Sequence, residues 1–255
     1  MTRLAIVSAM HEELAAVLAL MAGAQQHRVA GREFAVGKLH GHEVVVVLAR
    51  IGKVAAATTA TVLLERFGIS QMLFTGVAGG LAAQARVGDV VVATEFLQHD
   101  MDAAPLFPTY EVPLYGLSHF KTDAALTAEL ELAAETVLQR GLLDASTLHA
   151  FGMQQAQSHQ AQTHRGLILS GDRFVSTLAE SQRLQQALPE ALAVEMEGAA
   201  VAQVCHDFGV PFAALRTISD RADDDAHADF LKFVERVASR YSAAILAQFF
   251  THRAR

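Results

Sequence analysis

Short apolar segments alternate with longer amphipathic ones along this sequence, and this alternation constrains the fold more than any other feature. Several of the short segments are apolar at every position, as strands are when helices cover both faces of a sheet. Strands are predicted over 3–9, 32–39, 43–49, 71–78, 89–97, 166–171, 192–196 and 211–219. Helices are predicted over 11–23, 52–68, 122–141, 198–209 and about 228–250. The alternation predicts an α/β sheet with right-handed crossovers.

The chain has 255 residues, of which 52% are hydrophobic and 18% are charged, which is enough for a sizeable core. No repeat and no long linker divides it, so we expect a single domain over 1–255. The segment 144–165 is rich in Gln, His and Ala, and we expect it to be a surface insertion. Its histidines have no acidic or Cys companions, which disfavours a metal site at His149, His159 and His164.

Charge and hydropathy exclude several classes of protein. The net charge is -7 and the Lys and Arg residues are scattered, so a nucleic-acid partner is not expected. No apolar run reaches the roughly 18 residues of a membrane helix, and residues 1–14 do not resemble a signal peptide. The single cysteine, Cys205, cannot form an intramolecular disulfide and is expected in the core. We therefore expect a cytoplasmic protein.

Carboxylates and glycines recur where the predicted strands end. Ligands of open α/β sheets bind beyond the carboxyl ends of the strands. The sequence therefore predicts a site built from the segments at this edge, which read AMHEE (9–13), GVAGG (76–80), QHDMD (98–102), SGDRFV (170–175), VEMEG (194–198) and SDRADDD (219–225).

Two acids, Glu195 and Glu197, interrupt an otherwise apolar stretch, which is costly unless something needs them. If the segment is extended, both face one ligand or one buried partner, with Met196 opposite. If a helix has already begun, the two side chains diverge by about 200°. A buried salt bridge is the alternative to a functional role.

The residues of the other motifs can also have purely structural roles. Glu12 and Glu13 are favourable charges at a helix N-terminus, and Ser219 or Asp220 can cap a helix. The glycines of 76–80 suit a tight turn, and Asp223–Asp225 suit a solvated acidic loop.

Taken together, AMHEE, IGKVAAA, TGVAGGL, VGDVVV, SGDRFV, VEMEGAAVAQVC and RTISD resemble the bacterial 5′-methylthioadenosine/S-adenosylhomocysteine nucleosidases. These enzymes belong to the purine and uridine phosphorylase superfamily. The resemblance covers about residues 3–250. It implies one domain with a central mixed, twisted sheet flanked by helices, and hydrolysis of the bond between adenine and a 5′-thio-substituted ribose.

The resemblance also assigns roles to residues. Glu13 activates the attacking water, Asp220 donates a proton toward adenine N7, and Glu197 holds the ribose hydroxyls with Met196 against the sugar. Phe107 is expected to reach the 5′-thio pocket of a neighbouring subunit in a homodimer. The remaining substrate contacts are expected from Val77, Ala78, Gly79, Phe174, Val175, Glu195, Ser219 and Phe230, and Glu195 stands behind Glu197 as a supporting acid.

The chemistry suits these roles. Cleavage develops positive charge on the sugar, by analogy with O-glycosides, and adenine leaves more easily once N7 is protonated. A free Asp has a pKa near about 3.9, but burial at a strand end can raise the pKa of such a group. The ligand is a small adenine nucleoside, and no metal or other cofactor is implied.

Three alternatives stay open. Arg50 stands where some relatives have a small residue, and arginines hold phosphate in related phosphorylases, so a phosphate-dependent phosphorylase is one. A nucleosidase for another nucleoside, such as futalosine or AMP, is the second. The third is a nucleoside-binding or structural dimer without activity. The sequence does not rank the 5′-substituted adenosines.

Overall fold

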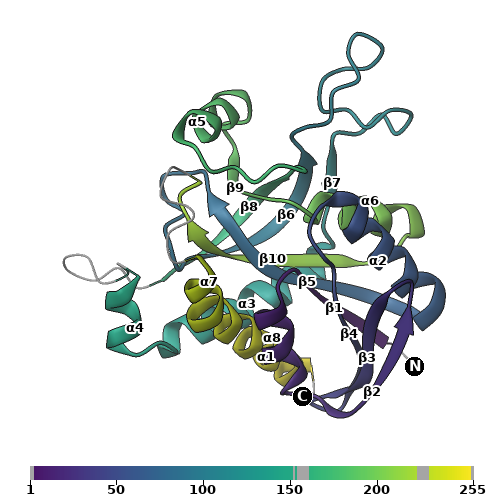
Figure 1. Cartoon of the computed structure of the whole chain (residues 1–255), viewed down its shortest axis with the longest axis vertical. Helices are drawn as coiled ribbons and strands as arrows, with labels where there is room; N and C mark the ends of the chain where they lie inside the picture. The colour runs from purple at the N-terminus through teal and green to yellow at the C-terminus, as the bar shows by residue number, and fades with distance from the viewer. Residues whose placement is uncertain (1–2, 152, 154–160, 223–229, 254–255) are drawn as a thin grey trace.

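The computed structural model describes residues 3–151, 153, 161–222 and 230–253. One mixed sheet runs through the centre of the molecule (Figure 1). Its strands are β1 (Arg3–Ser8), β2 (Ala22–Val29), β3 (Arg32–Leu39), β4 (His42–Leu48), β5 (Ile69–Gly80), β6 (Val90–Gln98), β7 (His119–Lys121), β8 (Thr163–Ser170), β9 (Ala191–Glu195) and β10 (Phe212–Asp220).

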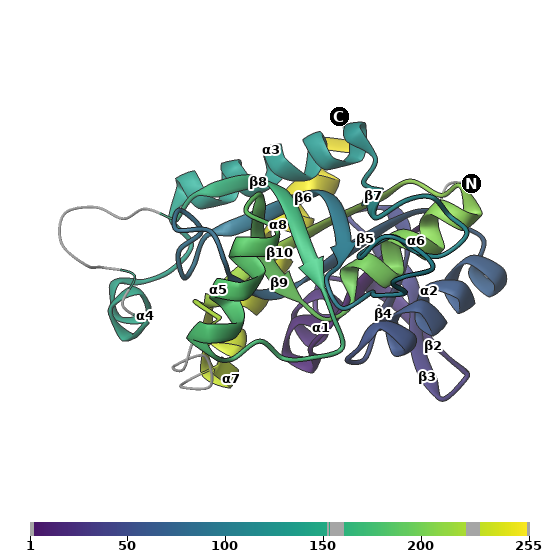
Figure 2. The same cartoon turned by 90° about the horizontal axis from the view of Figure 1, so that it is seen from above.

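Helices cover both faces of this sheet, as Figure 2 shows. Helices α1, α3 and α8 pack together on one face, and α2 packs against α6 on the other. The helical segments are α1 (His11–Leu18), α2 (Lys53–Phe67), α3 (Ala124–Arg140), α4 (Ala145–Ala150), α5 (Leu178–Ala187), α6 (Gly198–Phe208), α7 (Phe230–Phe233), the π-helical turn η1 (Val234–Ala238) and α8 (Ser239–Arg253). The predicted α/β fold, a mixed sheet flanked by helices, is confirmed.

The sheet differs from an open one because part of it closes into a ring. Strand β5 pairs in parallel with β10 and antiparallel with β9. Strand β10 pairs with β6, which continues through β8 to β9 and so back to β5. Strands β1, β4, β3 and β2 extend the sheet outward from the other edge of β5. Closure brings strand ends together that would lie far apart in an open sheet.

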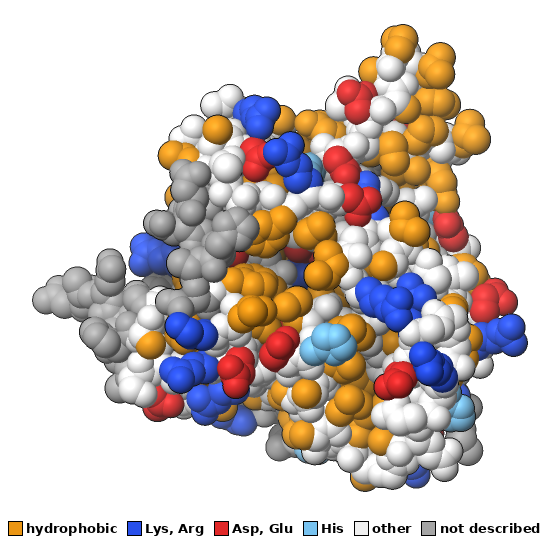
Figure 3. Space-filling model, viewed as in Figure 1, with side chains coloured by type: hydrophobic (Ala, Val, Ile, Leu, Met, Phe, Trp, Pro, Cys, Tyr) orange, Lys and Arg blue, Asp and Glu red, His pale blue; other side chains and the backbone are white. Residues whose placement is uncertain are grey.

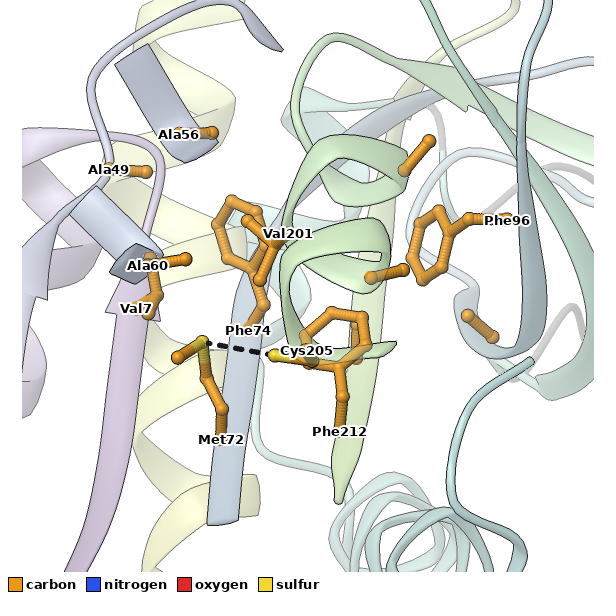
Figure 4. Close-up of a cluster of buried hydrophobic side chains, with 14 of the residues drawn as sticks. Val7, Ala49, Ala56, Ala60, Met72, Phe74, Phe96, Val201, Cys205 and Phe212 are labelled. Atoms are coloured by element: carbon orange, nitrogen blue, oxygen red, sulfur yellow. Dashed lines mark hydrogen bonds between the residues drawn. The ribbon is translucent and has the colours of Figure 1, made fainter. Parts of the chain in front are cut away.

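Two layers of apolar side chains fill the space between the sheet and the helices. One layer joins α2 and α6 to the sheet, and Figure 4 shows part of it. Small residues such as Ala56 and Ala60 on α2 let that helix approach α6 closely. Cys205 lies in this layer with its sulfur 3.8 Å from that of Met72, as expected of a core residue.

Several helices and strands were not predicted from the periodicity of the sequence. Strand β2 is polar and mostly exposed, and it exists because it pairs antiparallel with β3. The expected insertion at 144–165 contains α4, and its last residues, 163–165, begin β8. Residues 152 and 154–160, with His159, and the acidic segment 223–225 lie outside the described residues. His164 lies 2.8 Å from Asp89. Within the described part of the chain, no helix is long and apolar enough to cross a membrane.

Candidate active site

A cleft with an empty volume of about 720 Å³ opens where the ring closes. Gly79 of β5 is the centre of this arrangement, because it is paired with Asp220 of β10 on one side and Val194 of β9 on the other. Strand β8 adds the segment after Ser170, which is paired with Glu195. Four strand ends therefore meet at one place, and Figure 3 shows a hollow bordered by hydrophobic side chains on this face.

The cleft gathers most of the residues that the sequence predicted for the site. Two predicted residues are not on its walls: Glu13 is fully buried beside Met10, and Phe107 is half-buried in the segment between β6 and β7. The predicted residues that do line the cleft are Val77, Ala78, Gly79, Phe174, Val175, Glu195, Met196, Glu197, Ser219, Asp220 and Phe230.

Glu195 and Glu197 have different surroundings because the strand ends between them. Glu195 is the last residue of β9, whereas Glu197 already precedes the first turn of α6. Both acids line the cleft and both are buried. The two side chains are therefore neither a simple extended pair nor members of one helix.

The Glu195 carboxylate is occupied by protein donors. It accepts hydrogen bonds from the Ser170 hydroxyl and from the backbone N–H groups of Glu197 and Gly198, and Arg216 donates to it over 2.7 Å. These contacts leave little capacity for a ligand, which suits a supporting acid. Glu195 fixes the turn on which Glu197 stands.

Glu197 keeps capacity for a ligand. One of its oxygens accepts from the Gly52 N–H over 2.9 Å, and its side chain reaches the cleft. Burial, reinforced by the nearby charge of Glu195, raises the pKa of Glu197. A carboxyl group in this state can both donate to and accept from a pair of hydroxyls.

The turn that donates to Glu197 is itself held by a polar network. The Lys53 ammonium donates to Gln98 and Asp100, while its backbone N–H donates to Asp172 over 2.7 Å. Asp100 in turn accepts from the Asp172 N–H. Burial opposes ionisation of Asp100, but the hydrogen bonds from Lys53 and Asp172 hold its pKa below the usual value. The network joins the start of α2 to the ends of β6 and β8.

Glu13 occupies the third position of α1, where it also accepts from the Met10 N–H over 3.3 Å. The helix-terminus role foreseen for this motif is thus present. The other carboxylate oxygen of Glu13 is buried and has no hydrogen-bond partner among the described residues. Burial raises the pKa of Glu13 to about 7, although the charge of Arg216 opposes this. A buried carboxyl with a free oxygen and a pKa near neutrality is suited to accept a proton.

Arg216 is a site residue that the sequence analysis missed. It is fully buried in β10, its guanidinium lies 4.1 Å from the centre of the Phe74 ring, and its Nε has no hydrogen-bond partner among the described residues. Gly76 permits this placement, because a Cβ there would lie 3.3 Å from the Arg216 Nε. A charged residue in an apolar strand, like the acids of VEMEG, was the signal that could have revealed it.

Asp220 ends β10 and is tied to its surroundings by short hydrogen bonds. One oxygen accepts from the Ala222 N–H over 2.8 Å, and the Ser219 hydroxyl donates to the other over 2.7 Å. Gly79 packs against it, since a Cβ at position 79 would lie 3.0 Å from the Asp220 oxygen. The glycines of 76–80 thus belong to a strand rather than to the tight turn that we expected, and they admit neighbouring groups closely.

Aromatic and aliphatic side chains complete the walls. The rings of Phe174 and Phe230 meet edge to face with their centres 6.2 Å apart. The remaining wall residues were not predicted individually but lie inside the motifs quoted above, and they are Ala9, Met10, Ile51, Arg173 and Val194. The cleft can therefore hold a flat apolar ring between hydrophobic walls while presenting carboxyl groups to polar edges.

A family model described as the phosphorylase superfamily matches residues 3–251. A protein of Shewanella baltica called 5′-methylthioadenosine/S-adenosylhomocysteine nucleosidase is 34% identical over 246 residues, which are 96% of this chain and 94% of that protein. The nucleosidase of the same name from Neisseria meningitidis, solved with methylthio-immucillin-A, is 31% identical with a TM-score of 0.84, over 98% of both chains.

A second solved structure qualifies this likeness. Futalosine hydrolase of Helicobacter pylori is 32% identical with a TM-score of 0.82, and the match covers 98% of both chains. Nucleosidases for different substrates therefore share this architecture. From the match over nearly the whole length, the chain belongs to the phosphorylase superfamily and, within it, to the family of the 5′-methylthioadenosine/S-adenosylhomocysteine nucleosidases.

Proposed function

We propose that this protein hydrolyses the N-glycosidic bond of 5′-methylthioadenosine and S-adenosylhomocysteine, releasing adenine and the 5′-thio-substituted ribose. The observation that carries this proposal is the meeting of Asp220 and Glu197 on the walls of one apolar cleft, with the buried Glu13 directly behind the wall residue Met10. The names of its relatives supply the substrates.

In the proposed mechanism, the base lies against Phe174 and Val175 with its N7 toward Asp220. Asp220 transfers its proton to N7 as the bond between C1′ and N9 breaks, so adenine leaves as a neutral molecule. Glu197 holds the ribose hydroxyls on the side of Gly52, which fixes the sugar as positive charge develops on it.

Water attacks C1′ from the face opposite the base. Glu13 accepts the proton of this water through its unpartnered oxygen, and the unpartnered Nε–H of Arg216 donates a hydrogen bond to the same water. The charge of Arg216 acts on Glu13, which supports placing the two groups at one position. The proton lost by Asp220 and the proton gained by Glu13 balance the reaction.

The cleft favours water over phosphate as the nucleophile. Glu195 and Glu197 line the cleft, Glu13 lies behind its wall, and the Arg216 guanidinium is already paired with Glu195. A phosphate dianion would meet this acidic surface. The second candidate function is futalosine hydrolysis, which the likeness to futalosine hydrolase favours.

A substrate panel tests the proposal. The release of the free base should be measured with methylthioadenosine, S-adenosylhomocysteine, futalosine and AMP, each with and without phosphate. We expect adenine release from the first two without phosphate. Formation of a ribose 1-phosphate that depends on phosphate, or cleavage of futalosine alone, would contradict the proposal. Tight nucleoside binding with no base release would indicate an inactive binding protein.

Glu197→Gln should lower kcat/KM for methylthioadenosine by at least about a hundredfold while the fold is retained. The amide keeps an acceptor for the Gly52 N–H, but it has no negative charge with which to stabilise the positive charge that develops on the sugar. The measurement is adenine release, with thermal unfolding as the control for the fold. Turnover near that of the wild type would remove Glu197 from the ribose site.

We also propose that the protein is a homodimer. The segment between β6 and β7 projects from the body of the molecule (Figure 1) and exposes Leu106 by 84% and Leu114 by 91%. Tyr115 fastens it to α6 through a 2.8 Å hydrogen bond from its hydroxyl to Asp207. Val54, 77% exposed, lies on α2 beside α6. Such a fixed apolar surface suits a second copy of the chain.

Leu114→Asp should shift the protein from dimer to monomer, because a carboxylate would be buried in the interface. Sedimentation gives the mass, and Leu132→Asp on α3, a position 53% exposed, is the matched control. A wild-type monomer would refute the dimer.

If Phe107 acts in the partner, mixing inactive Phe107→Ala and Glu197→Gln proteins should restore adenine release in hybrid dimers. Failure of this rescue would place Phe107 outside the neighbouring site.

A further inference from the structure

A second cavity adjoins the cleft. It has an empty volume of about 1280 Å³ and shares Ala9, Met10 and Ile51 with the first cavity. Beyond these shared residues its lining includes several charged side chains. The charged and titratable side chains on its walls are His11, Glu12, Arg28, Arg32, Glu33 and Arg50.

One of the three arginines is occupied by the protein. Arg32 is buried and donates to the Thr59 hydroxyl and to the carbonyls of Ala30 and Ala55. These bonds join the β2–β3 hairpin to α2 and use the guanidinium for structure. Arg32 is therefore not a ligand-binding candidate.

Arg28 and Arg50 are exposed, and among the residues that the structure describes Arg50 donates one hydrogen bond, from its Nη2 to the Gly31 carbonyl. Arg50 stands in a left-handed backbone conformation with φ of 66°, which is uncommon for a residue with a long side chain. It directly precedes Ile51, a wall residue of both cavities. Two guanidinium groups in the lining of one cavity suit a carboxylate.

Acidic groups lie in the same cavity. One oxygen of Glu12 is buried and lacks a hydrogen-bond partner among the described residues. Glu33 is the cross-strand neighbour of Arg28 in the β2–β3 pair. A buried carboxylate oxygen without a donor is costly, and an ammonium group supplies the donor it lacks. The cavity thus offers contacts to groups of both charges.

Resting on the proposed function, we infer that this charged cavity binds the α-amino acid end of a 5′-substituent, with Arg28 and Arg50 on its carboxylate and Glu12 on its ammonium. The shared wall at Met10 and Ile51 lies beside Gly52, which binds Glu197 at the ribose. A 5′-substituent leaving the ribose on this side enters the second cavity. Methylthioadenosine is too short to use it, whereas S-adenosylhomocysteine has the matching zwitterion.

The test compares kcat/KM for S-adenosylhomocysteine with kcat/KM for 5′-butylthioadenosine, whose substituent lacks both charges. Arg50→Gln and Glu12→Gln should each lower this ratio about tenfold, because each removes one charge-assisted hydrogen bond. The matched control is Arg66→Gln, an exposed arginine at the end of α2 outside both cavities. The wild-type ratio should also fall as salt approaches about 1 M.

A ratio that stays within about twofold of the wild-type value in both variants would overturn the inference, even if both nucleosides are cleaved. Variants that change the mass of the assembly but not the ratio would overturn it too, because a second copy would then occupy the cavity. Absence of adenine release from either nucleoside would instead refute the proposed function and this inference with it. Loss of activity toward both substrates alike would mark Arg50 and Glu12 as structural.

Discussion

Asp220→Asn should lower the rate of adenine release by at least about a hundredfold. The amide has nearly the shape of the carboxyl group and keeps an oxygen for the Ala222 N–H. It can offer a hydrogen bond to N7 but cannot transfer a proton to it. The departing adenine must then leave as a poorer leaving group. Single-turnover measurements with methylthioadenosine give the rate of the chemical step directly.

Two controls make the result specific to proton transfer. The variant should bind a non-cleavable nucleoside analogue with nearly the wild-type Kd, because the walls around Phe174 and Val175 are unchanged. A substrate whose base leaves readily without protonation should lose far less rate than methylthioadenosine does. Equal losses for both substrates would assign Asp220 to binding rather than to acid catalysis.

Glu13→Gln should cause a loss of similar size, at least about a hundredfold in kcat/KM. A general base must be ionised, and burial raises the pKa of Glu13 to about 7. The wild-type rate should therefore rise with pH and level off above about 7. The variant should lack this rise, because its amide does not titrate. A variant that keeps the same pH profile would show that another group activates the water.

Stability offers an independent measurement on Glu13. The pKa of this carboxyl rises from its ordinary value of 4.5 to about 7 on folding, so burial favours the protonated form. Its contribution to stability is complete below about 4.5, declines as pH rises and is lost above about 7, a change of about 3 kcal/mol. The free energy of unfolding of Glu13→Gln should vary less over this range. Parallel curves for the two proteins would contradict the buried environment.

The strand ends were the most predictable part of the site. AMHEE, SGDRFV and the pair Ser219–Asp220 lie at the edge of the sheet, as predicted, because a change from apolar to polar residues marks a strand end locally. The relation of Glu195 to Glu197 could not be predicted in the same way. It depends on β9 stopping at Glu195 and α6 starting at Gly198, and element boundaries are weakly encoded.

Contacts between residues that are far apart in the sequence could not be predicted for a different reason. Arg216 looks like an isolated charge until Gly76, Phe74 and Glu195 are brought beside it from other strands. Closure of the sheet likewise depends on β10 pairing with both β5 and β6, which no local pattern reports. Phe107 remains a prediction, because its proposed contact is with a second chain.

The Arg216–Glu195 ion pair has a consequence for how a nucleoside enters. It bridges β10 and β9. Strand β10 ends at Asp220, the proposed proton donor, and β9 ends two residues before Glu197, which we propose binds the ribose. Separating these strands would leave two unpaired charges in the interior, at a cost of about 3–5 kcal/mol. We therefore expect the two strands to stay together when a nucleoside enters. We therefore expect admission and release at the rim formed by Ile51, Phe174 and Phe230, because displacing these apolar side chains leaves the Arg216–Glu195 pair intact.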